Sequence, residues 1–140
     1  MFAVRQDDSL VEITCETAVI DFERFGMAAG GANLARLPGR SAKIRFTEGQ
    51  EVRIIALLPG AVDPRRLELQ SFEYRGMTRV SYIGPFKAGP GANWNARSFR
   101  AQQLKDGRWL LEPASQLRPG EYCFSPKFNY DNFCFGVDKK

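Results

Sequence analysis

The chain carries few residues that could do chemistry, and histidine is absent from its 140 residues. Without an imidazole, neither a Ser-His-Asp triad nor a Cys-His pair can form within the chain. Cys15, Cys123 and Cys134 are its only soft metal ligands, and their wide spacing does not fit a structural zinc site. The composition therefore predicts no metal and no other cofactor.

Paired carboxylates are the remaining route to catalysis. Glu68 with Glu73, or Asp131 with Asp138, would be the candidate pairs. Glycosidases need two carboxylates at a defined distance across a cleft, and nothing in the sequence sets such a distance here. We therefore expect the protein not to be an enzyme.

A further set of residues has the side chains of a binding loop. Residues 84–95 contain three glycines and two prolines, so regular structure is not expected there. Long loops in compact domains are more often functional or disordered than incidental. The candidate binding residues are Phe86, Lys87, Trp94 and Asn95, joined by Lys127 and Tyr130 of a second loop. The alternative is that Phe86 and Trp94 fold back and cap one end of the domain.

Arginine is abundant, but the net charge is only +4 and the arginines are scattered along the chain. A nucleic-acid interface would gather them on one surface with interleaved aromatic residues, and only residues 75–100 come close to this pattern. We expect the arginines to lie on the solvated outer faces of strands. Nucleic-acid binding is accordingly disfavoured.

Two runs near the end of the chain, residues 117–124 and 133–138, are predicted to form a closing β-hairpin because both are rich in aromatic and β-branched residues. Side chains alternate between the two faces of a strand. Pairing Cys123 with Cys134 therefore places both cysteines on one face and four aromatic residues on the other: Tyr122, Phe124, Phe133 and Phe135. The cysteines would then be close enough to bond, although reduced thiols are favoured for a cytosolic chain.

The residues before this hairpin also carry a local signal. Leu117, Gly120 and Tyr122 have the spacing of a tyrosine corner, in which a hydroxyl bonds back to the preceding loop. An ordinary buried tyrosine is the alternative. From their phase on patterned strands, the expected core residues are Leu58, Val80, Trp109, Tyr122, Phe124 and Phe135.

The rest of the chain also has the patterns of strands. Further strands are expected at residues 10–14, 18–22, 42–46, 52–58, 67–74 and 78–83, and residues 97–111 form a hairpin that turns at Asp106-Gly107. A change of phase between Leu69 and Phe72 suggests a β-bulge or a bend. Residues 23–40 are expected to be a long loop.

These elements predict an all-β fold, a single-domain immunoglobulin-like β-sandwich of about nine or ten strands over residues 1–140, with one long irregular loop. The segment Leu117-x-Pro-Gly-Glu-Tyr, followed by Phe-Cys-Phe-Gly-Val-Asp, resembles the end of a poorly characterised bacterial β-sandwich module that closes with a PGEY strand and an FGVD strand. Val62-Asp63-Pro64, Leu67-Glu-Leu and Arg79-Val80 fit the same pattern. The resemblance covers residues 41–138 and implies a fold, with no catalytic residue.

The expected function is a non-enzymatic module for protein–protein interaction or assembly, with a protein partner or by self-association. The alternative is a carbohydrate- or small-ligand-binding domain that uses loop aromatics. No apolar run approaches the ~20 residues of a membrane-spanning helix. The first residues lack a basic start followed by an apolar run, which favours a cytoplasmic protein and leaves an exported domain open.

Overall fold

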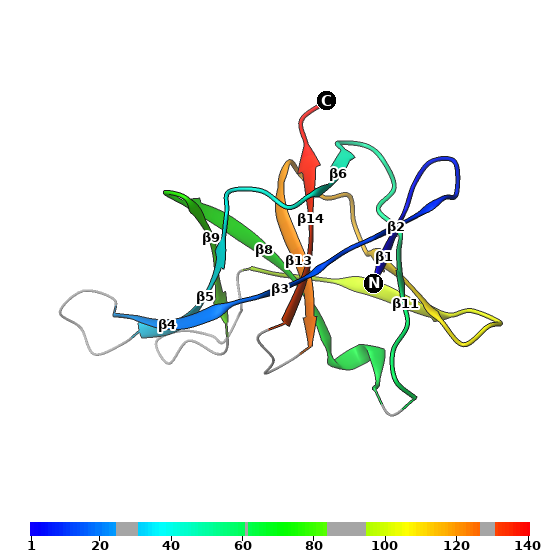
Figure 1. Cartoon of the computed structure of the whole chain (residues 1–140), viewed down its shortest axis with the longest axis horizontal. Coiled ribbons are helices and arrows are strands. Elements are labelled where there is room, and N and C mark those ends of the chain that lie inside the picture. The colour runs from blue at the N-terminus through cyan, green and yellow to red at the C-terminus, as the bar shows by residue number, and fades with distance from the viewer. Residues whose placement is uncertain (25–30, 61, 84–94, 127–130) are drawn as a thin grey trace.

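The computed structural model describes residues 1–24, 31–60, 62–83, 95–126 and 131–140 (Figure 1). These residues form fourteen strands and one 3-10 helix, Pro64–Arg66, so the predicted all-β, sandwich-like fold is confirmed. Among the described residues, no helix is long and apolar enough to cross a membrane.

The strands form two sheets. The small sheet has five strands in the order β11 (Phe99–Gln103), β12 (Trp109–Pro113), β7 (Ile54–Ala56), β1 (Phe2–Val4) and β2 (Leu10–Glu12). The large sheet has nine strands, and its main order is β3 (Cys15–Thr17), β14 (Asp131–Asp138), β13 (Gly120–Pro126), β8 (Leu67–Arg75), β9 (Thr78–Ile83), β5 (Gly31–Pro38) and β4 (Val19–Arg24). Its other two strands are β10 (Ala96–Arg97), which pairs with β8, and β6 (Ile44–Thr47), which pairs with β14 in parallel. All other pairs are antiparallel.

The large sheet curls until its two ends meet. Its order begins with β3 and ends with β4, yet only Ala18 separates these strands in the sequence, and Figure 1 shows them as successive stretches of one extended segment. The curled sheet encloses a set of buried residues, here called the inner cluster: Ala18, Ala35, Leu37, Ala42, Phe72, Cys123 and Cys134. One face of β13 and β14 therefore points into this enclosure.

The other face of β13 and β14 packs toward the small sheet. The buried residues between the two sheets, here called the aromatic core, include Phe46, Leu69, Leu111, Tyr122, Phe124 and Phe135. The Phe124 ring lies edge-on to Phe99 of β11, with 5.2 Å between the ring centroids. The rings of Tyr122 and Phe135 stack at 5.9 Å. The closing hairpin is thus buried on both faces.

The register of this hairpin confirms the prediction made from alternation. Cys123 pairs with Cys134, and Tyr122 pairs with Phe135. The Tyr122 hydroxyl donates a hydrogen bond of 2.8 Å to the carbonyl of Arg118, so the predicted tyrosine corner is present. The hairpin that turns at Asp106-Gly107 is confirmed as well, with β11 paired to β12 and Gly107 at a φ of 85°.

The structure differs from the expectations in two places. Within residues 23–40, which were expected to be a long loop, residues 31–38 instead form β5 between β4 and β9. The run that indicated a break, residues 27–31, ends at the first residue of β5. The small residues that follow, Ala32 and Ala35, are buried, so tertiary packing outweighs their weak strand propensity. Strands β1, β3, β5 and β10 were not predicted, which raises the number of strands from the expected nine or ten to fourteen in the described residues.

The expected β-bulge in β8 is also replaced by another explanation. β8 runs without a break from Leu67 to Arg75. Leu69 contacts the aromatic core, whereas Phe72 lies on the opposite face in the inner cluster. The change of phase therefore marks the point at which the strand passes from one core to the other.

Most of the predicted core residues are buried. Val80, Tyr122, Phe124 and Phe135 are each at most 5% exposed. Leu58 and Trp109 are only half-buried and pack against the margin of the aromatic core.

Replacement of Phe124 by Ala should lower the free energy of unfolding by about 3–5 kcal/mol, the usual cost of removing a fully buried aromatic side chain. Phe124 has no exposed area and lies between Phe99 and Phe135. Urea unfolding measures this change. Leu57→Ala is the control, since Leu57 is 73% exposed and its loss should change stability by less than about 0.5 kcal/mol. A loss below about 1 kcal/mol for Phe124→Ala would reject the two-faced burial of β13.

Candidate functional site

Most of the binding residues predicted from the sequence cannot be placed. Phe86, Lys87, Trp94, Lys127 and Tyr130 lie outside the described residues. Asn95 is described, and it is buried just before β10. Its carbonyl accepts hydrogen bonds from the Ser71 backbone N–H at 2.7 Å and from the Ser71 hydroxyl at 3.3 Å. The backbone of Asn95 thus ties the end of its segment to β8.

The candidate carboxylate pairs lie apart. Glu68 and Glu73 are on opposite faces of β8, because their positions differ by five, an odd number. Asp131 and Asp138 occupy the two ends of β14, which at about 3.3 Å per residue puts them more than 20 Å apart. Glycosidase carboxyl groups lie about 5–9.5 Å apart. These pairs therefore cannot perform two-carboxylate chemistry, and no group of His, Cys, Asp or Glu within the described ranges is placed to hold a metal ion.

A first surface suited to recognition is β4. It is the last strand of the large sheet and, in the described part of the chain, pairs only with β5. Val19 and Phe22 are 62% and 63% exposed on it. The Phe22 ring lies against Gly31 of β5, where any larger residue would collide with it. A second strand that pairs with this edge could cover part of the exposed aromatic and aliphatic surface.

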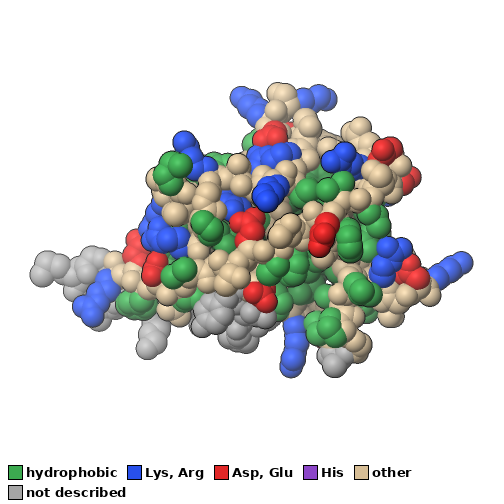
Figure 2. All heavy atoms as spheres, viewed as in Figure 1, with side chains coloured by type: hydrophobic (Ala, Val, Ile, Leu, Met, Phe, Trp, Pro, Cys, Tyr) green, Lys and Arg blue, Asp and Glu red, His purple; other side chains and the backbone are tan. Residues whose placement is uncertain are grey.

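The acidic residues of β4 are neutralised within the chain. Asp21 forms an ion pair of 3.0 Å with Arg36, and Glu23 forms one of 2.8 Å with Arg75. The Tyr82 hydroxyl also donates to Glu23 at 2.9 Å. The hydrogen bonds from Arg75 and then Tyr82 lower the pKa of Glu23, so this carboxylate is charged at neutral pH. Figure 2 shows basic side chains spread over the visible face, with no single basic patch.

A second surface is an open hollow of about 770 Å³ beside the small sheet. Phe99, Ala101 and Trp109 form one wall, and they lie on the face of β11 and β12 that looks toward the large sheet, since Ala101 pairs with the core residue Leu111. The segment around Pro64 forms the opposite wall. β11 is the last strand of its sheet, so this face extends past the part that the large sheet covers.

Two charged residues line the hollow: Asp63, directly before the 3-10 helix, and Arg65, within it. Asp63 caps this helix, and its carboxylate accepts the Arg65 backbone N–H at 2.9 Å. The Arg65 guanidinium binds the same carboxylate at 2.8 Å. These hydrogen bonds from Arg65 lower the pKa of Asp63. The hollow thus combines an aromatic wall with a donor and an acceptor whose charges cancel.

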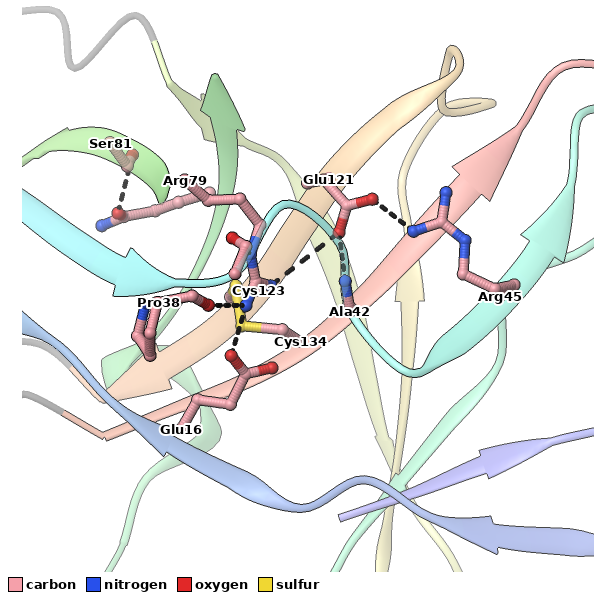
Figure 3. The surroundings of a disulfide bond; sticks show 11 residues. Glu16, Pro38, Ala42, Arg45, Arg79, Ser81, Glu121, Cys123 and Cys134 are labelled. Atoms are coloured by element: carbon pink, nitrogen blue, oxygen red, sulfur yellow. Dashed lines mark hydrogen bonds and ion pairs between the residues drawn. A yellow bond between two sulfur atoms is a disulfide. The ribbon is translucent and has the colours of Figure 1, made fainter. Parts of the chain in front are cut away.

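The most deeply buried polar groups are not in either surface but in the enclosure of the large sheet (Figure 3). Arg79 of β9 is 1% exposed, so the expectation that the arginines lie on solvated faces is wrong for this residue. Its guanidinium donates to the carbonyls of Gly39 at 3.1 Å and Pro38 at 3.0 Å, and it also binds the Glu16 carboxylate. Nη1 lies 3.8 Å from Oε2 of Glu121. A buried charge is tolerated only with such partners.

Glu121 is the centre of this network. Its carboxylate accepts the Ala42 backbone N–H at 2.8 Å and the Tyr74 hydroxyl at 3.2 Å. It also binds Arg45, which continues to Asp138 with 3.2 Å from Nε to Oδ2. The hydrogen bonds from Arg45 lower the pKa of Asp138.

The path of Arg45 requires a glycine on β14. The Arg45 guanidinium occupies the space that a Cβ at position 136 would need, so only Gly136 lets it cross the strand to reach Glu121. Gly136 and Asp138 belong to the FGVD sequence, and Glu121 belongs to the PGEY sequence. Their roles in this network are structural, since each carboxylate is held by arginine.

Cys123 and Cys134 form a disulfide beside this network, with their Cα atoms 4.1 Å apart (Figure 3). The expectation of two reduced thiols is therefore wrong, while the predicted pairing is correct. Both residues are at most 2% exposed, so the disulfide has no direct access to a reductant in the folded chain. Cys15 of β3 is a free, exposed thiol.

Sequence reasoning missed the network and the hollow for different reasons. Glu121 is in phase with the two cysteines, so its place on their face could have been found from the same alternation. Trp109 carried the signal of a core residue, and nothing in its neighbourhood indicated that the end of the small sheet is open.

Comparison with family models, with curated proteins and with solved structures finds no match to this chain. The resemblance to the bacterial module and the immunoglobulin-like assignment therefore stay predictions.

Replacement of Glu121 by Ala should lower the free energy of unfolding by about 3–5 kcal/mol, because it leaves Arg79 buried with one carboxylate fewer. It also removes the acceptor of the Ala42 N–H. Urea unfolding again provides the measurement. Arg53→Ala is the control: it removes an exposed ion pair with Asp8, which should contribute less than about 1 kcal/mol. Equal losses for the two variants would contradict a buried ionic network at Glu121.

Proposed function

We propose that the protein is a non-enzymatic interaction module that assembles with a second copy of itself through β4. The observation that carries this proposal is the exposure of Val19 and Phe22 on a strand that, in the described part of the chain, has one paired edge. Figure 1 places β4 and β5 at one end of the long axis.

The sequence of β4 supports pairing with a like strand. Natural edge strands are usually protected by lysine, proline or a bulge, and β4 contains neither lysine nor proline. An antiparallel pair that sets Phe22 opposite Phe22 of the second copy also sets Ile20 opposite Arg24, and Asp21 opposite Glu23, whose charges are already balanced by arginines. The two Arg24 side chains then lie at opposite ends of the pair.

Ion pairing within each chain supports the same proposal. Because Asp21 and Glu23 are already paired with Arg36 and Arg75, two β4 strands would meet without a net repulsion between acidic groups. The main-chain hydrogen bonds of an added strand would give affinity. Val19 and Phe22, on opposite faces of β4, would each add an apolar contact on one face of the pair.

Val19→Lys should weaken self-association at least about tenfold, because it places a positive charge on the pairing edge of each β4 strand. Sedimentation velocity over a range of concentrations measures the dimer fraction. Leu57→Lys is the matched control, since Leu57 is equally apolar and 73% exposed but lies outside β4; it should leave the dimer unchanged. A wild-type chain that stays monomeric at all concentrations, or equal weakening by both variants, would reject assembly through β4.

A further inference from the structure

The hollow beside Trp109 has the size and the composition of a ligand site. Ligand pockets in proteins have volumes of about 300–1,000 Å³ and combine apolar walls with a few fixed polar groups. The hollow has about 770 Å³, and its walls carry Phe99, Trp109 and Pro64 together with the polar pair Asp63 and Arg65. None of the residues that line the hollow belongs to β4 or to the buried ionic network around Glu121.

Trp109 is held as a platform at this site. The side chain is half-buried, since one part packs against the aromatic core and another part lines the hollow. Its strand pairs on both sides, with Gln103 of β11 and with Ala56 of β7. A fixed indole presents an electron-rich face, which attracts weakly positive C–H groups.

Asp63 and Arg65 together indicate that a ligand of this hollow has no net charge. The carboxylate and the guanidinium bind each other, so the pair has no net charge and favours neither an anion nor a cation. It still offers a strong acceptor and several donors at the same place. Hydroxyl groups, which both donate and accept, match such a pair. The Arg65 backbone N–H and guanidinium both donate hydrogen bonds to the Asp63 carboxylate.

From these observations we infer that the hollow is a binding site for a neutral saccharide. The apolar C–H face of a pyranose ring stacks on Trp109, while its hydroxyls bond to Asp63 and Arg65. The hollow is open to solvent, which leaves room for a chain of sugars to continue. This site is independent of self-association through β4, because β4 and β11 lie toward opposite ends of the long axis (Figure 1).

The test uses the full chain on an array of neutral and sulfated oligosaccharides, followed by calorimetric titration of the neutral oligosaccharide with the strongest signal. Trp109→Ala could unfold the margin of the aromatic core, so the decisive variant is Ala101→Arg. Ala101 is exposed on the wall of the hollow, and an arginine there fills it. Gln102→Arg is the matched control, because the adjacent exposed residue points to the other face of β11.

Ala101→Arg should weaken saccharide binding at least about tenfold, with a melting temperature within about 3 °C of the wild type. Gln102→Arg should leave the affinity unchanged. Binding of sulfated glycans alone, absence of any saccharide binding at millimolar concentration, or equal effects of the two variants would each overturn the inference. None of these outcomes depends on the oligomeric state, which the Val19→Lys experiment measures separately.

Discussion

Strands β13 and β14 have no solvent-facing side in their middle, and the other layers of the molecule are arranged to cover their two faces. The aromatic residues on one face require the small sheet, with Phe99 of β11 against Phe124. The opposite face carries the disulfide and the charged side chain of Glu121, so the large sheet must curl around it and bring Arg79 and Arg45 into reach. A buried carboxylate without those arginines would be strongly destabilising, and the enclosure therefore depends on this set of ion pairs.

Both proposed recognition surfaces arise at the margins of these covering layers. β4 completes the curl of the large sheet and ends with an edge that no described strand covers. The hollow forms where β11 and β12 extend past the large sheet, which leaves part of Trp109 without a covering layer. Residues in these two surfaces can therefore be substituted without altering the central β13–β14 hairpin, on which the fold depends. Binding residues are commonly found at such positions, on the periphery of a fixed scaffold.

Features determined by neighbouring residues could be predicted from the sequence. The register of Cys123 with Cys134 followed from alternation alone, and the tyrosine corner at Tyr122 followed from a short spacing. Features that join distant segments could not be predicted in this way. The approach of Arg79 to Glu121 joins strands far apart in the chain, and no spacing reports it. β5 was missed because its glycine and alanine residues have weak strand propensity, which burial between β4 and β9 outweighs. Five of the six predicted binding residues lie outside the described residues, so the proposed surfaces rest on other side chains.

The central claim is that the β13–β14 pair is the most stable part of the molecule because both of its faces are covered. Native-state amide hydrogen exchange tests this claim residue by residue, since it measures the free energy at which each hydrogen bond opens. The account predicts that the paired amides of β13 and β14 exchange only through global unfolding, whereas those of β2 and β4 open at lower free energies. Exchange of β13 and β14 through local opening, no more slowly than β2 and β4, would contradict it.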